Sequence, residues 1–368
     1  MATIKDIAKE ACVSEGTVDR VIHNRGGVSK ITEAKIKKIL KHHNFSVNPI
    51  ASALAMKNKY YIATLIPKFK SSDLFWESPY LGVKKATENV KSIGVTVQNF
   101  DFNQYKIDSY LKGFDKLLKT NPTAVIIVPY FSEQTKIIAK KLEDNDIPYI
   151  FLNIDVKGFN NISYIGQNSI KAGQIVGKLM CLLATKPKTT FLIIQAVHHN
   201  IKNNTVSKRI DGFCDYISNN DSNYNILTLK VEDLNNTKDT KKRISSYLYK
   251  HPEVHGIFVP SSRISRVVEC LEEKLLKKIN LIGFDNTPQN VKCLLDDSVS
   301  FLISQRPFDQ GYEAILMMCE FLTNKIKSPT RIYMPIDILT KENVIYNSRK
   351  EFNKALFNET KQKTVKNS

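Results

Sequence analysis

The spacing of the apolar positions changes along the chain, and the change predicts two kinds of structure. Over about the first 45 residues the apolar positions recur every three or four residues, as in amphipathic helices. From about residue 60 short apolar runs, such as 61–66 and 124–128, alternate with helical stretches, such as 79–93 and 107–119. Strands that alternate with helices form parallel sheets covered on both faces. The alternation restarts near residue 161, so the pattern predicts two such lobes.

Two short helices open the chain and are separated by a one-residue break at Cys12. Their apolar stripes face each other, and the hydroxyl of Ser14 is placed to cap the second helix. This arrangement predicts a helix-turn-helix, whose second helix presents its outer face to a DNA major groove, although a bare helical hairpin would show the same pattern. The residues expected to contact DNA here are Ser14, Glu15, Gly16, Thr17, Asp19, Arg20, Asn24 and Ser29.

A third helix over 32–43 and a short fourth helix complete this N-terminal part. A glycine turn precedes the third helix, and Asn48 and Pro49 give the fourth helix a cap and a proline at its first position. In this order of helices the chain resembles the lac-repressor and purine-repressor family of bacterial transcription factors. In that family the fourth helix is a hinge that folds on the operator and wedges a leucine into the minor groove. Leu54 matches that leucine.

The resemblance extends over essentially the whole chain and implies its domain organisation. The family's effector domain is similar to the periplasmic sugar-binding proteins, in which the chain crosses three times between two lobes. We place the crossings near Tyr164, Ser300 and Met334. The expected fold class is α/β: an all-α helix-turn-helix headpiece and a hinge helix, then a two-lobed domain with parallel sheets. The expected boundaries are a headpiece at 1–45, a hinge helix and linker at 46–58, an effector-binding and dimerisation domain at 59–350, and a basic polar tail at 351–368. Within the effector-binding domain, the first lobe is expected at 59–163 and 301–333 and the second at 164–300 and 334–350.

The resemblance also implies an effector site between the lobes. In the sugar-binding family, aromatic side chains about six residues before a helix glycine stack on the sugar ring. Trp76 stands six residues before Gly82, with Phe75 next to it, although a core aromatic would look the same in sequence. Arg209 matches the family's Arg-x-x-Gly-Phe segment, and its planar guanidinium suits vicinal hydroxyls or a carboxylate. Asp285 matches a Gly-aromatic-Asp segment, and Gln305 matches a glutamine at a lobe crossing.

At several positions the chain departs from the family pattern. Asn153 stands where the family often has Asp, and Asp155 is close enough to substitute for it. Ser261 lies in a segment where relatives usually carry Asn-Asp, so no relative's ligand can be carried over. In the headpiece Cys12 stands where the family usually has Gly, at a cost of about 1–2 kcal/mol if the turn is left-handed. Asp19 replaces a serine, and its charge repels phosphate unless it accepts a hydrogen bond from cytosine.

Composition agrees with this interpretation without deciding it. The net charge of +18 suits a polyanionic partner, but Lys, Asn and Ile are abundant throughout the chain. The apolar runs are only strand-length and no charged-then-apolar leader opens the sequence, so we expect a cytoplasmic protein that does not associate with membranes. The six cysteines are scattered, mostly within apolar segments, which favours reduced thiols over disulfides.

Motifs of enzymes and of metal sites are not found. The sequence has no glycine-rich dinucleotide loop, P-loop or nucleophile elbow. The adjacent histidines at 42–43 and 198–199 diverge and have no partner ligand nearby in sequence, and Pro252 breaks the helix that a site at His251 and His255 would need. We therefore expect no enzymatic activity, no cofactor and no metal.

The sequence thus predicts a dimeric regulator that binds a palindromic double-stranded DNA operator. Its affinity for the operator would change when a small polar effector, in the first place a sugar, binds between the lobes. A nucleobase or another non-sugar metabolite is the alternative effector. Two other classes of protein share part of the pattern: a sugar-binding protein without a regulatory role, against which the headpiece argues, and an enzyme on a doubly wound fold, against which the missing motifs argue.

Overall fold

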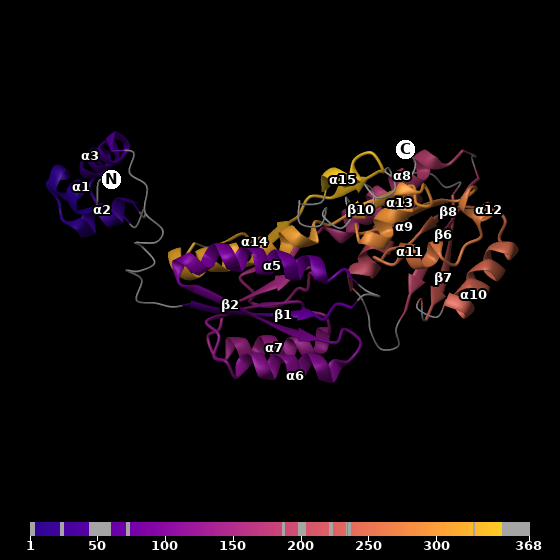
Figure 1. Cartoon of the computed structure of the whole chain (residues 1–368), viewed down its shortest axis with the longest axis horizontal. Coiled ribbons are helices and arrows are strands. Elements are labelled where there is room, and N and C mark those ends of the chain that lie inside the picture. Colours follow the sequence, from indigo (N-terminus) through magenta and orange to yellow (C-terminus); the bar gives the residue numbers. More distant parts are fainter. Residues whose placement is uncertain are drawn as a thin grey trace, which may run out of the picture.

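The computed structural model describes residues 4–22, 26–43, 60–70, 74–185, 188–197, 204–220, 224–232, 234, 237–326 and 328–347. Three helices come first, and two sheets flanked by helices follow (Figure 1). The α/β class and the parallel sheets expected from the sequence are confirmed. The expected DNA contact Asn24, the hinge region with Leu54 and the tail from residue 351 lie outside the described residues.

A small bundle of helices forms the headpiece. α1 runs over Ile4–Ala11, α2 over Glu15–Ile22 and α3 over Lys30–His42. Helices this short are marginal alone, and packing of their apolar faces stabilises them. The buried residues at their common core are Ile7, Ala8, Ala11, Val18, Val21, Ile36 and Ile39.

The turns of the headpiece agree with the sequence interpretation. Cys12 has a φ of 56°, the left-handed conformation that a glycine adopts without strain. The hydroxyl of Ser14 accepts a hydrogen bond from the amide of Thr17 at 3.3 Å and so caps α2. Ser29 caps α3 in the same way, accepting from the amide of Thr32 at 3.2 Å. Each cap satisfies an amide that has no partner within its own helix.

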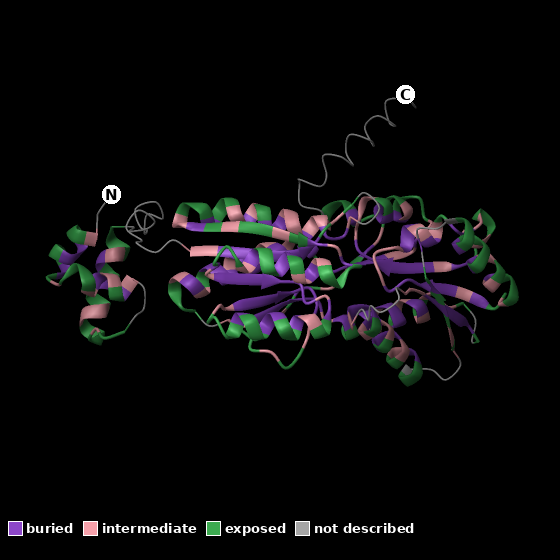
Figure 2. Ribbon diagram, turned by 90° about the horizontal axis from the view of Figure 1, so that it is seen from below, coloured by how far each residue is buried: buried purple, intermediate pink, exposed green. Residues whose placement is uncertain are grey.

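The first lobe is built on a six-stranded sheet in the order β11-β5-β4-β3-β1-β2, in which every pair is parallel. Helices α5 and α14 cover one face and α6 and α7 cover the other (Figure 1). Because both faces are covered, the central strands are buried (Figure 2). The elements are β1 Tyr60–Pro67, α5 Glu77–Val90, η1 Lys91–Ile93, β2 Val95–Phe102, α6 Ile107–Leu118, β3 Ala124–Ile127, α7 Ser132–Glu143, β4 Tyr149–Leu152, β5 Ser163–Gly166, α14 Pro307–Asn324 and β11 Arg331–Tyr333.

The second lobe repeats this plan with the order β12-β10-β9-β8-β6-β7, in which only β12 is antiparallel to its neighbour. Helices α8 and α9 pack on one face, and α10, α11 and α13 on the other. The elements are α8 Ser169–Leu183, β6 Thr190–Ala196, α9 Asn204–Asn220, β7 Asn225–Val231, α10 Thr237–Lys250, β8 Val254–Phe258, α11 Ile264–Val268, α12 Glu273–Leu276, β9 Asn280–Phe284, α13 Pro288–Leu295, β10 Phe301–Ser304, β12 Asp337–Leu339 and α15 Val344–Asn347.

The chain crosses between the lobes three times, and two crossings lie later than the sequence predicted. Tyr164, expected at the first crossing, is inside β5 of the first sheet, so the chain leaves that lobe only after Gly166. The second crossing, expected near Ser300, follows Ser304, because β10 pairs with β9 in the second sheet. Met334 lies between β11 and β12, which belong to different sheets. Both misplaced strands are short and apolar, and such a run does not indicate which sheet it joins.

The cysteines and the helix lengths bear on two further expectations. All six cysteines are free, and Cys12 alone among them is exposed. Burial raises the pKa of the Cys293 and Cys319 thiols to about 11, so both are protonated near neutral pH. Among the described residues, no helix is both long and apolar enough to span a bilayer.

Candidate functional site between the lobes

A cavity of about 110 Å³ lies between the two lobes, at the carboxyl ends of both sheets. This is several times the roughly 10–15 Å³ that one water needs, so a small molecule can enter it. Seven of the eight residues expected to bind an effector line the cavity: Phe75, Trp76, Asn153, Arg209, Ser261, Asp285 and Gln305. The sequence analysis did not identify the other lining residues, which are Gln104, Tyr105, Tyr130, Ile154, Ala196, Thr205, Val206, Ser262 and Arg263.

The first-lobe wall of the cavity is aromatic and uncharged. Phe75 and Trp76 follow β1, and their rings meet edge to face with centroids 4.9 Å apart. Trp76 is only 4% exposed, and its Nε1 donates to Oε1 of Gln104 at 3.2 Å, the kind of partner that a buried indole needs. Gln104 and Tyr105 follow β2, and Tyr130 follows β3. Because these residues directly follow predicted strands, the sequence could have indicated that they line the cavity.

The second-lobe wall is charged, and Arg209 is its most buried cation. The side chain is 3% exposed, its guanidinium lies 3.7 Å from the centroid of the Phe284 ring, and its Nη1 donates to the carbonyl of Pro260 at 3.0 Å. Burial lowers the pKa of Arg209 to about 10, against the opposing effect of the Asp285 charge. Nε and Nη2 have no hydrogen-bond partner within the described part of the chain. A buried charged donor without a partner costs more than about 1–3 kcal/mol, so Arg209 is ready to receive an acceptor.

Close packing of α8 against α9 positions Arg209. A Cβ at Gly212 would lie 2.0 Å from the carbonyl oxygen of Ile170, and one at Gly173 would lie 2.0 Å from that of Arg209. The two backbones therefore touch, and neither glycine can be replaced without moving a helix. Phe213 is fully buried in the core beneath them. The Arg-x-x-Gly-Phe segment thus acts as a unit, in which the glycine and phenylalanine fix the helix that carries the arginine.

The first lobe uses the same device behind Trp76. A Cβ at Gly82 in α5 would lie 2.0 Å from the carbonyl oxygen of Phe308, and one at Gly311 in α14 would lie 2.1 Å from that of Pro79. The glycine six residues after Trp76 therefore sets how closely α5 approaches α14. This contact gives a physical reason for the spacing noted in the sequence.

A chain of buried amides joins the lobes across the cavity. Nδ2 of Asn153 donates to Oε1 of both Gln305 and Gln310, at 3.0 Å each, and Nε2 of Gln305 donates to Oδ1 of Asp285 at 2.9 Å. Asn153 directly follows β4 and Asp285 directly follows β9, with φ values of 68° and 69°. These left-handed residues turn the chain sharply at the strand ends. Gln305, at the second crossing, therefore contacts one strand end from each lobe.

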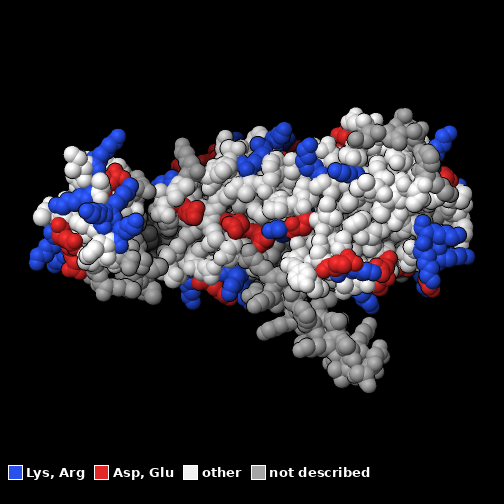
Figure 3. Space-filling model, turned by 90° about the horizontal axis from the view of Figure 1, so that it is seen from above, with Lys and Arg blue, Asp and Glu red and all other residues white. Residues whose placement is uncertain are grey.

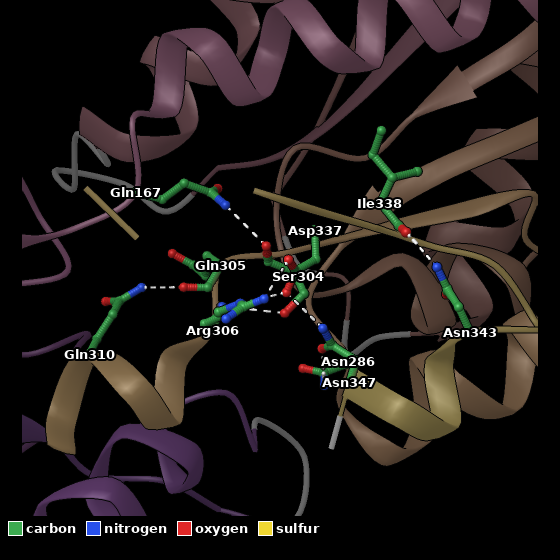
Figure 4. A network of polar contacts seen from close by, with 10 residues as sticks. All are labelled: Gln167, Asn286, Ser304, Gln305, Arg306, Gln310, Asp337, Ile338, Asn343 and Asn347. Atoms are coloured by element: carbon green, nitrogen blue, oxygen red, sulfur yellow. Dashed lines mark hydrogen bonds and ion pairs between the residues drawn. The ribbon is translucent and has the colours of Figure 1, made fainter. Parts of the chain in front are cut away.

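Further hydrogen bonds connect the crossing segments to one another (Figure 4). Nε2 of Gln167, at the first crossing, donates to the carbonyl of Ser304 at 3.0 Å. Arg306 makes a bidentate pair with Asp337, with Nε and Nη2 at 2.8 and 3.0 Å from the two carboxylate oxygens. Bidentate pairs fix both position and angle. The three crossings are thereby linked into one joint.

The headpiece carries the second group of predicted contacts. Of the described ones, Ser14, Glu15, Gly16, Arg20 and Ser29 are exposed, and Thr17 and Asp19 are partly exposed. Residues 1–45 contain nine Lys and Arg against five Asp and Glu, and basic side chains are prominent on the headpiece in Figure 3. The excess positive charge suits a phosphate backbone.

Comparison with known proteins agrees with both parts of the chain. A model described as "Periplasmic binding protein domain" matches residues 62–326, and one described as "Bacterial regulatory proteins, lacI family" matches residues 3–48. The chain belongs to the lacI family. The ribose operon repressor of Lactococcus lactis is 24% identical over 95% of this chain and 100% of its own length. The ribose operon repressor of Bacillus subtilis is 23% identical over 93% of this chain and 98% of its own.

Solved structures give the same fold for the lacI-family effector domain. A LacI-type regulator from Bacteroides fragilis has a TM-score of 0.71 and 27% identity, covering 78% of this chain and 99% of its own. A solute-binding protein from Burkholderia graminis in complex with D-arabinose has a TM-score of 0.68 at 20% identity, covering 78% and 98%. The second likeness concerns the fold alone. The regulators among these relatives are named for their role in transcription.

Asp155 is the one predicted effector residue that this lacI-family structure places outside the cavity. Its carboxylate lies 3.3 Å from Nε of Arg331 and 3.5 Å from Nζ of Lys208, and its carbonyl accepts from Lys208 and from Asn204. The expectation that Asp155 substitutes for the family's aspartate is therefore wrong. Its partners come from residues far away in sequence, so the sequence could not indicate them.

The histidine pair of the headpiece has a partner that the sequence analysis missed. Nε2 of His43 lies 2.6 Å from Oε2 of Glu10, and a ligand atom of His42 lies within 4.8 Å of both. Glu10 is in α1 and the histidines end α3. All three side chains are exposed. In this lacI-family headpiece the contact joins the first helix to the last.

Proposed function

We propose that this lacI-family protein is a sequence-specific transcriptional repressor whose affinity for its operator is controlled by a small polar effector, a sugar, bound between the lobes. It acts as a homodimer on a palindromic double-stranded operator in the cytoplasm and catalyses no reaction. The observation that carries the proposal is the cavity itself: it joins Trp76, Arg209, Asp285 and Gln305 from both lobes in a chain that also has a helix-turn-helix.

The cavity wall supports a polyhydroxylated effector. Aromatic rings such as Trp76 suit the apolar C–H face of a sugar, while Arg209, Asp285 and Gln305 offer donors and acceptors for hydroxyl groups. Because the polar groups come from both lobes, such a ligand binds the closed arrangement more tightly than an open one. This difference in affinity is what lets a ligand shift the equilibrium between two states.

The headpiece supports operator binding through the outer face of α2. Glu15, Asp19 and Arg20 are the side chains proposed to read base edges, while Ser14, Thr17, Asn24 and Ser29 are proposed to contact the backbone or neighbouring bases. Leu54 is proposed as the minor-groove wedge by its match to the family's hinge leucine.

A gel-shift experiment with genomic fragments, followed by footprinting, tests the DNA-binding part. We expect protection of a palindrome and an affinity that falls steeply with salt, by about 0.9 in the log–log slope for each phosphate neutralised. Leu54→Ala should reduce bending and affinity while leaving effector binding intact. Equal affinity for random DNA, or a flat salt response, would contradict the proposal.

A thermal-shift screen over sugars and nucleobases tests the effector part. A ligand at about 100 times its dissociation constant stabilises the folded state by roughly 2.7 kcal/mol, which is easily detected. We expect a sugar to be the strongest hit and to change operator affinity in the gel shift. A nucleobase as the strongest hit would replace the sugar assignment, and a hit that leaves operator binding unaltered would contradict the regulatory role.

A further inference from the structure

A second cavity, of about 300 Å³, lies beside the joint between the lobes and contains Asp155. Residues of both lobes line it, and Thr205 lines this cavity and the effector cavity alike. The two cavities therefore share Thr205 as a common wall residue. Its charged lining residues are Lys157, Lys208, Arg331 and Asp155, so three cations face one carboxylate.

The carboxylate of Asp155 satisfies only some of the hydrogen-bond donors of these cations. Asp155 lies 3.3 Å from Arg331 and 3.5 Å from Lys208, longer than the 2.7–2.9 Å of a strong charge-assisted hydrogen bond. Arg331 contacts Asp155 through Nε, and the guanidinium has further N–H donors in its planar fork. Lys157 is exposed and has no partner among the described residues. The cavity thus keeps an excess of positive charge.

The start of a helix favours an anion at the same place. The cavity includes Asn168, Ser169 and Ile170, the cap and first residues of the 15-residue helix α8. The amides at the start of a helix and its dipole attract negative charge. Gln167, also in the wall, is 3% exposed, and its Oε1 has no hydrogen-bond partner in the described part of the chain. This oxygen is a hydrogen-bond acceptor, so it fits a ligand that carries a hydroxyl donor beside its anionic group.

We propose that this cavity is a second regulatory site, which binds the phosphate group of a small phosphorylated metabolite. The phosphate oxygens contact Lys157, Lys208 and Arg331 at the start of α8, and a P–OH or a neighbouring hydroxyl donates to Oε1 of Gln167. Lys208 belongs to the second lobe and Arg331 to the first. A bound phosphate therefore stabilises the present arrangement of the lobes and is coupled to the effector cavity through Thr205. The coupling rests on the proposed effector function, whereas the phosphate site itself does not.

Isothermal titration calorimetry of the full chain, without DNA or sugar, tests the site. The probes are inorganic phosphate and glycerol 3-phosphate, with glycerol as the neutral control, all at constant ionic strength. Lys157→Gln removes a charge without breaking any contact among the described residues, and Lys208→Gln removes a second. Lys178→Gln, an exposed position further along α8 that does not line the cavity, is the matched control.

We expect both phosphate probes to bind the unmodified protein and glycerol not to bind. Each of the two cavity substitutions should weaken phosphate binding about ten- to a hundredfold, because each removes a charge-assisted hydrogen bond, and Lys178→Gln should change it less than twofold. Equal affinities in all three variants, or no binding of either phosphate probe, would overturn the proposal. Binding of inorganic phosphate alone would overturn its extension to a phosphorylated metabolite.

A second titration tests the coupling. The strongest sugar from the thermal-shift screen is titrated with and without saturating glycerol 3-phosphate. We expect its dissociation constant to change at least fivefold, within the usual range of coupling between sites, and Lys157→Gln to abolish the change. An unaltered sugar affinity would overturn the regulatory role of the site. The calorimetry without sugar still decides phosphate binding, so this failure is distinct from a failure of the effector assignment.

Discussion

The two lobes share one construction and differ in what they present to the cavity between them. Each has a sheet of mainly parallel strands, and in each a pair of helices is packed backbone to backbone through two glycines. The first-lobe wall is aromatic and uncharged, with Trp76 and Gln104, whereas the second-lobe wall carries Arg209, Arg263 and Asp285. The shared backbone arrangement sets the direction of the side chains that line the cavity, whereas the type of side chain differs between the lobes. We therefore expect the first lobe to select ligand shape and the second to select polar groups.

The largest effect on stability is expected from substitutions at the glycines that bring each pair of helices into contact. Gly82→Ala in the first lobe and Gly212→Ala in the second each place a Cβ 2.0 Å from a carbonyl oxygen, so a helix must move. Overpacking usually costs about 1–3 kcal/mol, and we expect both variants to lose about 3 kcal/mol of unfolding free energy, measured by urea unfolding. Gly16→Ala is the control, since its Cβ would meet nothing nearer than Ser14 Oγ at 3.9 Å. A loss of unfolding free energy in only one of the two variants would show that the two lobes do not depend on the same helix contact.

The next largest effect is expected from removing a charged side chain in the second lobe. Arg209→Ala removes the buried guanidinium whose Nε and Nη2 await an acceptor, and we expect effector affinity to fall by about 10–100-fold, the worth of a hydrogen bond to a charged group. Arg209→Lys keeps the charge without the planar fork and should recover part of the affinity. Calorimetry measures the first effect, and a gel shift without effector should show unchanged operator binding. An unaltered ligand affinity would move the site elsewhere.

A first-lobe change of chemistry should have a smaller effect. Trp76→Phe keeps an aromatic face but removes the Nε1 donor to Gln104. We expect effector affinity to change by less than about tenfold, since one neutral hydrogen bond is worth about 1 kcal/mol. The same calorimetric titration measures it. If Trp76→Phe were as damaging as Arg209→Ala, the division of roles between the lobes would be wrong.

The smallest effect concerns the left-handed residues. Asn153 and Asp285 tolerate the left-handed conformation as Asn and Asp generally do, and the side chains of both are hydrogen-bonded. Cys12 in the headpiece also has a left-handed φ, of 56°, but its thiol is exposed. Cys12→Gly relieves about 1–2 kcal/mol of strain and loses about 0.5–1 kcal/mol to chain entropy. A net gain of about 0.5–1 kcal/mol in the unfolding free energy of the headpiece follows, measurable by thermal unfolding. A loss of stability would show that the sulfur contributes to packing.

The sequence was sufficient for the features that depend on local pattern. Alternating apolar runs indicated both sheets, and the cap at Ser14 followed from short-range spacing. Residues at strand ends, such as Asp285, were identifiable because parallel strands bring their carboxyl ends to one edge. Motif and strand order together therefore predicted seven of the sixteen residues that line the cavity.

The features that the sequence analysis missed depend on contacts between distant segments. Asp155 faces Lys208 and Arg331 rather than the cavity, and these partners lie 53 and 176 positions further along the chain. Arg263 of the second lobe donates to the hydroxyl of Tyr105 of the first, a contact that exists only once the lobes are assembled. The crossing after Ser304 was misplaced because a four-residue apolar strand fits either sheet.

Gln305 connects Asn153 to Asp285 across the cavity through two buried hydrogen bonds. We expect a molecule that binds here to require these buried hydrogen bonds to break and the lobes to move apart. The rate of association is then governed by opening rather than by diffusion and rises little with ligand concentration once opening is limiting. The same bonds slow escape after the lobes close again. We therefore expect the proposed regulator to respond to a sustained supply of its effector rather than to brief pulses, with the amide of Gln305 affecting the rate of the response as well as its strength.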